Sequence, residues 1–137
     1  GTVDREAFTA FYEGCRLPLV YNGDLRTQEE MQELLQAYPR LEGLMLGRGL
    51  LANPALAAGF RQGNTLPVSE LYRKVGQMHQ LIYAEYARTL EGGEAQILQK
   101  LKPMWEYCLP DLDKKARKAI LKSNKLDAYL RAVREAL

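Results

Sequence analysis

Two short segments decide the fold of this chain: LPLVYNGD at residues 17–24 and GLMLGRG at residues 43–49. Each has an apolar run that is too short for a surface helix and ends in a turn that contains glycine. Between them, residues 27–38 have the spacing of a helix with one apolar face. The order predicts two parallel buried strands joined by a helix, with both glycine turns side by side at the carboxyl ends of the strands.

The two turns have the composition of an anion-binding site. Glycine lets the backbone approach an anion closely, and successive exposed amides form a concavity that binds phosphate. In a (β/α)₈ (TIM) barrel, the loops after strands 7 and 8 form the usual phosphate site. Arg48 can add a charged contact, and Asp24 can orient Arg48 or a hydroxyl of the ligand. We predict a cofactor site of six residues: Asn22, Gly23, Asp24, Gly47, Arg48 and Gly49.

The length of the chain limits how much of a barrel it can form. A complete barrel needs roughly 250 residues, whereas the chain has 137. Two parallel strands alone also leave faces and edges uncovered. We therefore expect a fragment that carries the last βα units of a barrel; the alternative is that the strands pair with another chain. Exposed strand edges would allow the fragment to self-associate.

Local signals place the helices of the first part. Asp4 can cap a first helix, and Thr27 with Glu30 forms a capping-box pattern. Asn53 followed by Pro54 is a typical helix start, with Asn as the cap and Pro in the first turn. We therefore expect the helix after the second glycine turn to begin at these two residues.

The sequence changes character after residue 62, where strand signals stop. Apolar spacing predicts helices over residues 69–90, 94–107 and 114–122, and a last helix that opens near Ser123 or Asn124. Pro103 should kink or divide the second of these helices. We therefore expect an α/β part, residues 1–62, followed by an all-α helical bundle, residues 63–137, in a chain that is mostly helical.

Composition excludes several classes of protein. Apolar residues make up 47% of the chain and charged residues 26%, as in ordinary soluble domains. No apolar run approaches the roughly 20 residues of a membrane span, and no signal peptide opens the sequence. Cys15 and Cys108 lie far apart without a CxxC pair, so we expect neither a disulfide framework nor a metal site. Reduced cysteines fit a cytoplasmic protein.

The small net charge of +2 is unevenly distributed along the chain. Residues 96–137 contain ten Lys and Arg against five Asp and Glu, a net charge of +5, and residues 1–95 carry a net charge of −3. A basic end indicates a polyanion partner, although a solvent-exposed helix surface explains the same composition. The residues that we expect to contact its phosphates are Lys100, Lys102, Lys114, Lys115, Arg117 and Lys118, with Lys122 and Lys125 beyond them.

Other polar and aromatic residues are expected to be structural. His79 lies beside the apolar stripe of the long helix, where we expect packing rather than proton transfer. Trp105 and Tyr107 are predicted to line the core or a groove rather than to stack on bases. Four tyrosines at helical positions are expected to pack: Tyr72, Tyr83, Tyr86 and Tyr129.

The two decisive segments also resemble a known family. PLVYNGD at residues 18–24 and GLMLGRGLLANP at residues 43–54 look like the last two strands of the tRNA-dihydrouridine synthases. ILQKLKPMWEY at residues 97–107 is similar to a stretch of the family's helical domain, where basic residues precede an aromatic. The resemblance implies an FMN-containing barrel followed by a helical domain that binds tRNA.

The resemblance also implies roles for particular residues. Asn22, Gly23 and Asp24 would face the ribityl-phosphate side of FMN, and residues 47–49 would hold its phosphate. The family reduces a uridine double bond in tRNA, with NADPH recharging the flavin. Its catalytic cysteine, lysine and histidine lie on earlier strands, and neither cysteine of this chain matches that position. We therefore expect the parent protein to be an oxidoreductase and this fragment alone to be inactive.

Two other functions stay open at this stage. One is a phosphate-binding barrel, such as a flavin oxidoreductase, that acts on a small metabolite. The other is a non-enzymatic helical RNA-binding module with a vestigial βα unit. The basic tail favours RNA over a metabolite, and the two glycine turns argue against a purely helical module.

Overall fold

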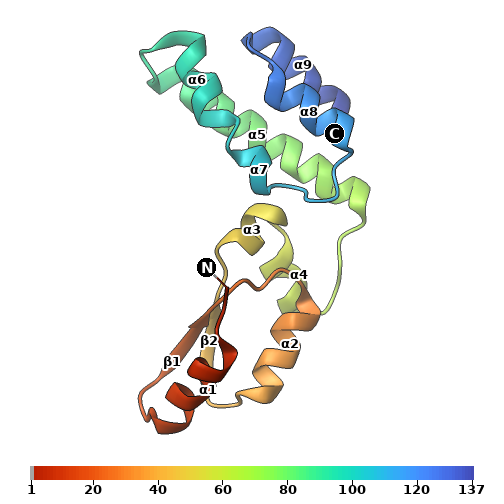
Figure 1. The fold of residues 1–137 in the computed structure, drawn as a ribbon. Helices are drawn as coiled ribbons and strands as arrows, with labels where there is room; N and C mark the ends of the chain where they lie inside the picture. Colours follow the sequence, from red (N-terminus) through yellow and green to blue (C-terminus); the bar gives the residue numbers. More distant parts are fainter. Residues whose placement is uncertain (1) are drawn as a thin grey trace. The chain divides into compact units, whose positions relative to one another are not determined.

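A computed structural model describes residues 2–137, and helices make up most of them (Figure 1). The chain divides into two units. Unit 1 comprises the residues up to Leu50 together with Ala55–Thr65, and unit 2 comprises Leu51–Pro54 and Leu66–Leu137. The assignment of residues 1–62 and 63–137 to two functional domains stays a prediction.

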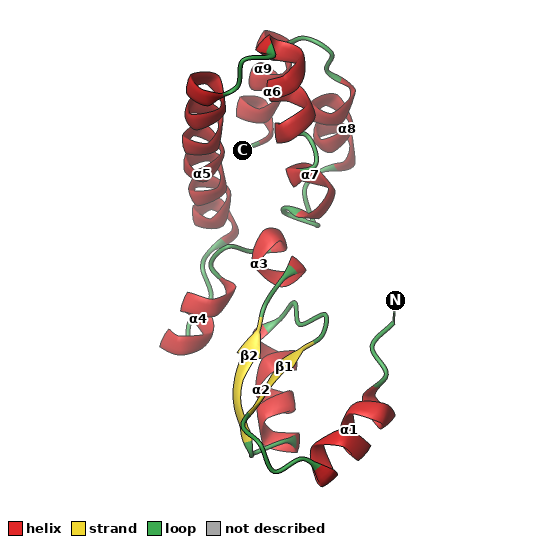
Figure 2. Cartoon of the chain, turned by 90° about the vertical axis from the view of Figure 1, so that its left-hand side faces the viewer, coloured by secondary structure: helices red, strands yellow, loops and turns green. Residues whose placement is uncertain are grey.

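Unit 1 contains the two predicted strands. Its elements are α1 (Arg5–Gly14), β1 (Leu19–Asn22), α2 (Gln28–Ala37), β2 (Leu41–Met45) and α4 (Leu56–Gln62), and α3 (Arg48–Ala52) crosses the division. The strands are parallel, with Tyr21 opposite Leu44 and Asn22 opposite Met45, which confirms the predicted strand–helix–strand order. Helix α2 runs along one face of the pair (Figure 2).

Local capping signals fix the starts of α1 and α2. Asp4 accepts a hydrogen bond from the Ala7 amide, as predicted. Thr27 accepts from the Glu30 amide, and the Glu30 carboxylate accepts in turn from the Thr27 amide, so the predicted capping box is complete. Each bond satisfies an amide that has no partner inside its helix.

The predicted helix start at Asn53-Pro54 is wrong. Residues 48–52 already form the single-turn helix α3, and α4 begins only at Leu56, with Ala55 in the cap position and no side-chain cap. A buried anchor decides the position of α4, because Leu56 is 2% exposed and packs in the unit 1 core. Asn53 and Pro54 therefore form the joint between two short helices.

The core of unit 1 lies among the strands, α2 and α4. Its buried members are Tyr21, Leu25, Met31, Leu34 and Leu56. An aromatic cluster flanks it, where Phe8 packs edge-on against Tyr21 and Tyr38 at centroid distances of 4.8 and 5.0 Å. Edge-to-face pairs of this kind hold α1 against the sheet.

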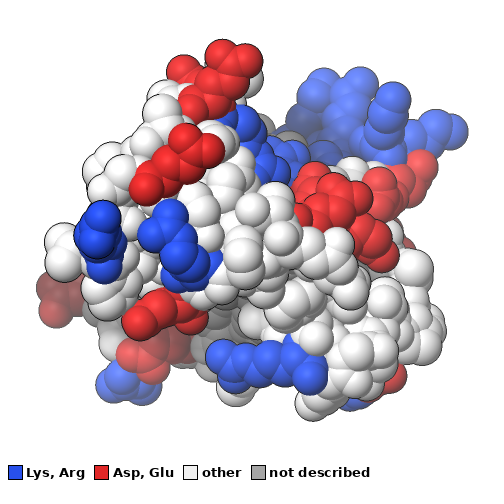
Figure 3. Space-filling model, turned by 90° about the horizontal axis from the view of Figure 1, so that it is seen from below, with Lys and Arg blue, Asp and Glu red and all other residues white. Residues whose placement is uncertain are grey.

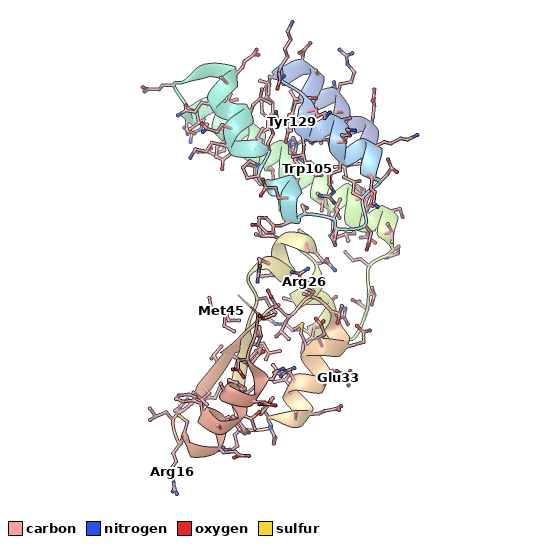
Figure 4. All side chains as sticks on the ribbon, in the orientation of Figure 1. Arg16, Arg26, Glu33, Met45, Trp105 and Tyr129 are labelled. Atoms are coloured by element: carbon pink, nitrogen blue, oxygen red, sulfur yellow. The ribbon has the colours of Figure 1, made fainter. Side chains whose placement is uncertain are left out.

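Unit 2 is formed by helices around one apolar core. They are α5 (Val68–Thr89), α6 (Gly93–Leu101), α7 (Met104–Tyr107), α8 (Lys114–Lys122) and α9 (Leu126–Ala136). Pro103 divides α6 from α7, as predicted, and α8 has the predicted bounds. Trp105 and Tyr129 are fully buried at the centre of this core and lie between the helices (Figure 4).

Several large apolar side chains of unit 1 are exposed. Leu17 is 75% exposed, and Val20 and Met45 on the two strands are 60% and 57% exposed. These positions match the uncovered strand faces that the sequence predicts, and self-association through them stays a prediction. Among residues 2–137, no helix combines the length and the apolar character that crossing a membrane would require.

Candidate functional site

The structure brings the two glycine turns together at the carboxyl ends of β1 and β2. They line a cavity of about 340 Å³, and all six residues of the predicted cofactor site belong to its lining. The lining residues are Val3, Asn22, Gly23, Asp24, Leu25, Met45, Gly47, Arg48 and Gly49. Parallel pairing of the strands explains this arrangement, because the turns that follow β1 and β2 both leave the sheet at the same edge.

An ion pair spans the two turns across this cavity. The Arg48 guanidinium donates a hydrogen bond through Nη2 to Oδ1 of Asp24. The side chains are 51% and 35% exposed, so both groups can still contact a ligand. Asp24 adopts a φ of 24°, in the left-handed region that Asp tolerates better than most residues. The predicted orientation of Arg48 by Asp24 is therefore present.

The glycines of the two turns have different structural roles. Gly47 is exposed, and a Cβ atom there would meet nothing within 4 Å, so its backbone is open to an approaching group. Gly49 is buried, and a Cβ atom there would overlap the carbonyl oxygen of Leu25. At Gly23, a Cβ atom would lie 2.6 Å from the Tyr21 hydroxyl. Glycine is therefore required for packing at position 49, where the obstacle is backbone, whereas a side chain at position 23 would have to displace the Tyr21 ring; sequence reasoning did not separate these roles from ligand binding.

The predicted phosphate-contacting lysines lie on the surface of unit 2. Lys100 on α6 and Lys114, Lys115 and Lys118 on α8 are exposed, and Lys102 is half-buried. A basic recess of about 340 Å³ lies along α8 and is lined by Lys114, Arg117, Lys118, Leu121 and Lys122. By contrast, acidic and basic side chains alternate over the face in Figure 3, with uncharged surface between them. Phosphate binding by these lysines stays a prediction.

Arg117 differs from the lysines around it. Its guanidinium donates to three backbone carbonyl oxygens, those of Trp105, Cys108 and Leu109, with a distance of 3.2 Å to the oxygen of Cys108. These carbonyls end α7 and begin the turn that follows, where Leu109 has a φ of 49°. Arg117 therefore fixes the connection between α7 and α8, a role that sequence reasoning missed because the contact depends on the fold.

A buried polar network lies in the core of unit 2. Trp105 donates through Nε1 to the Tyr129 hydroxyl at 2.8 Å, and that hydroxyl lies 2.8 Å from Nε2 of His79. Because indole only donates, the Tyr129 oxygen accepts from Trp105. Among the described residues, Nε2 of His79 is the one acceptor within reach of the buried Tyr129 proton, so the arrangement favours the Nδ1–H tautomer of His79. Burial lowers the pKa of His79 to about 4 and raises the pKa of Tyr129 to about 12.

The network bears on three sequence predictions. The packing role expected for Tyr129 is confirmed, and its hydroxyl in addition connects two other buried polar side chains. The structural role expected for His79 and the core position expected for Trp105 are both confirmed, at 2% and 0% exposure. A useful sequence signal was available, since a buried Trp or Tyr needs a partner for its polar atom.

Comparison with known proteins identifies the family. The family model described as Dihydrouridine synthase (Dus) matches residues 3–133. The chain belongs to the dihydrouridine synthase family. This match includes both glycine turns and nearly all of unit 2, up to the last turn of α9.

Curated relatives agree with this assignment. A Mus musculus protein named tRNA-dihydrouridine(20a/20b) synthase, NAD(P)+-like, is 38% identical over 60 residues, which are 44% of this chain and 18% of that protein. The Schizosaccharomyces pombe tRNA-dihydrouridine(20a/20b) synthase is 35% identical over 66 residues, 43% of this chain and 20% of that protein. The chain therefore spans about a fifth of the length of the curated relatives it matches.

Two observations concern metal-ligating and thiol side chains. Among residues 2–137, no group of three or more His, Cys, Asp or Glu side chains could hold a metal ion. Burial raises the pKa of Cys108 to about 11, and the thiol is fully buried. Cys108 is therefore a poor nucleophile.

Proposed function

We propose that this chain is part of a flavin-dependent tRNA-dihydrouridine synthase, which reduces uridine to dihydrouridine in tRNA with NADPH as the reductant of FMN. Family membership and the names of the curated relatives support the reaction. In this proposal, residues 1–62 are the last βα units of a (β/α)₈ barrel and residues 63–137 are the helical tRNA-binding domain. The expected cytoplasmic location is part of the same proposal.

The cavity between the two glycine turns is the observation that carries the flavin assignment. Its residues fit a phosphate monoester in three ways: an open backbone at Gly47, a half-exposed cation at Arg48, and an amide side chain at Asn22 that can donate a hydrogen bond. FMN, when bound, supplies hydride transfer to the uridine double bond. The part of this chain is to hold and orient the phosphate end, through the turns after β1 and β2.

Each residue of the site has a distinct task in this proposal. Arg48 pairs with the phosphate charge, and Asp24 keeps the guanidinium over the cavity through their ion pair. Asn22 bonds a polar group next to the phosphate. Gly23 and Gly49 let the turns pack closely, because a Cβ atom at either position would meet Tyr21 or Leu25.

The tRNA contact is assigned to the exposed lysines of unit 2. Positioning charges of this kind follow the RNA backbone without reading bases. We expect salt-sensitive tRNA binding that charge reversal at Lys100 and Lys102 weakens, since each lost phosphate contact reduces the salt dependence by roughly one unit of slope. Salt-independent binding, or none, would indicate an ordinary solvent-exposed surface.

Titration with FMN tests the flavin assignment. The chain, or any longer protein that contains it, is titrated with FMN while flavin fluorescence is recorded, and Arg48→Ala should weaken binding about tenfold, the loss expected for a hydrogen bond to a charged group. Arg26→Ala is the matched control, because Arg26 is exposed and lies outside the cavity lining. A longer protein containing this chain should be yellow. A colourless protein that cannot be reconstituted with FMN would remove the proposal.

A further inference from the structure

A second cavity lies in unit 2, away from the glycine turns, between α5 and α9. Its volume is about 410 Å³, within the range of roughly 300–1,000 Å³ typical of ligand sites. The lining residues are Tyr72, Arg73, Gly76, His79, Gln80, Tyr83, Leu130, Val133, Arg134 and Leu137. Nothing in the flavin or lysine assignments uses this cavity.

The charged groups around the cavity favour an anionic ligand. Arg73 and Arg134 contribute two cations, and the lining residues contribute no side-chain carboxylate; the one carboxylate among them is the main-chain carboxylate of Leu137 in the 137-residue chain, so the cations remain in excess. Arg73 has one acidic neighbour outside the lining, Glu70, at 3.7 Å in a pair whose side chains are 57% and 41% exposed, which is a weak interaction. Among residues 2–137, the structure gives Arg134 no ion pair. Both guanidinium groups are therefore available to a phosphate.

His79 adds a buried hydrogen-bond donor to the cavity. The ring is 2% exposed, and its Nε2 is occupied by the Tyr129 hydroxyl. In the described part of the chain, no fully buried side-chain nitrogen or oxygen lacks a partner. Nδ1 has no hydrogen bond of its own, so it keeps accessible surface toward the cavity that His79 lines. In the favoured tautomer Nδ1 carries a proton, and it can donate to a carbonyl oxygen.

Aromatic and small residues give the cavity its shape. Tyr72 and Tyr83 are half-buried and line the cavity from α5, about three helical turns or roughly 16 Å apart along the helix axis. Between them, Gly76 leaves open the space that a side chain would fill, since a Cβ atom there would already lie 3.4 Å from Cδ1 of Leu137. Glycine in a helix interior costs stability relative to alanine. Helix stability therefore does not explain glycine at position 76, whereas an open cavity does.

We propose that the cavity between α5 and α9 binds a single unstacked nucleotide of an RNA, an inference that rests on the proposed tRNA-binding function. Tyr83, one helical turn from His79 on α5, provides the flat apolar surface that a base requires, and Nδ1–H of His79 donates to a base carbonyl. Arg73 and Arg134 contact the flanking phosphate. Splayed-out bases on aromatic side chains are the usual mode of single-stranded RNA recognition. An apolar peptide fits less well, because it would leave these donors unpaired.

Titration of the 137-residue chain with a fluorescently labelled pentauridylate, and with uridine 5′-monophosphate as competitor, tests the proposal. Arg134→Gln removes the phosphate contact, and Gly76→Leu fills the cavity with a side chain. Each variant should weaken pentauridylate binding about tenfold. Arg131→Gln is the matched charge control, since Arg131 is exposed on the same helix and lies outside the lining. Gly76→Ala is the matched helix control. Circular dichroism checks that each variant is folded.

The outcomes separate this site from the wider RNA-binding function. Saturable binding that uridine 5′-monophosphate displaces, and that falls in the two cavity variants but not in the controls, supports the proposal. An equal loss in Arg131→Gln overturns it, because nonspecific charge then explains the binding. Unchanged pentauridylate binding in both cavity variants also overturns it, even where charge reversal of Lys100 and Lys102 abolishes tRNA binding. Failure of tRNA binding alone, with cavity binding intact, contradicts the lysine assignment instead.

Discussion

Replacing Tyr129 with Phe removes one oxygen atom from the centre of unit 2 and leaves the ring in place. Two buried groups then lose their partner at once: the Trp105 indole N–H and Nε2 of His79, both 2.8 Å from the Tyr129 hydroxyl. Desolvation of these groups is already complete in the folded state, because Trp105 is 0% and His79 2% exposed. The variant should stay folded, because the ring still fills the core, but its free energy of unfolding should fall.

The size of the loss follows from the two unpaired groups. An unsatisfied buried donor or acceptor costs about 1–3 kcal/mol. The unpaired Trp105 N–H contributes the full cost. The cost at His79 is smaller, because His79 borders the cavity of about 410 Å³ and can form a hydrogen bond with water there. We expect a total loss of about 2–4 kcal/mol, a large part of the roughly 5–15 kcal/mol that stabilises an ordinary domain.

Urea unfolding followed by tryptophan fluorescence measures this loss directly, because Trp105 is the one tryptophan of the chain. The midpoint should fall with an unchanged slope. Tyr86→Phe is the matched control, since Tyr86 is half-buried on α5 and its hydroxyl makes no hydrogen bond within residues 2–137. A loss below about 0.5 kcal/mol in Tyr129→Phe, or one equal to that of the control, would refute the reasoning.

Three further predictions concern pH, packing and thiol reactivity. Burial lowers the pKa of His79 from 6.5 to about 4, so between these values the unfolded chain binds a proton that the folded chain does not. The free energy of unfolding should therefore fall by about 2 kcal/mol between about pH 7 and pH 5. Urea titrations at several pH values measure this change, and a flat profile contradicts it. Gly49→Ala should lower the thermal midpoint by overlapping Leu25, whereas Gly47→Ala should not. Iodoacetamide should label Cys15 in the folded chain and reach Cys108 only after unfolding, as mass spectrometry would show.

Local signals explain why much of unit 1 was predictable from the sequence. The capping box at Thr27 and the apolar runs before the glycine turns act over a few residues, and the structure contains the elements that they predict. Pro103 divides two helices for the same reason, since its ring clashes within one turn. The juxtaposition of the two turns follows from strand direction alone.

Contacts between distant residues account for what the sequence did not reveal. Tyr129 meets His79 across 50 residues, and Arg117 reaches the carbonyls that end α7, so no local pattern contains either contact. The Asn53-Pro54 signal failed because the burial of Leu56 decides where α4 begins. The sequence likewise does not reveal that the backbone at Gly47 is open whereas Gly49 packs against the Leu25 carbonyl, because this depends on how the two turns fold together.

The carboxylate that already holds Arg48 has a consequence for which anions can enter the first cavity. An incoming group must share the guanidinium with Asp24 and tolerate the negative charge of Asp24 nearby. Attraction to Arg48 and repulsion from Asp24 both grow with the charge of the incoming anion, so the pair as a whole attracts an anion only weakly. The ion pair therefore makes Asp24 a built-in competitor, which any anionic ligand has to displace from the guanidinium in order to bind it directly.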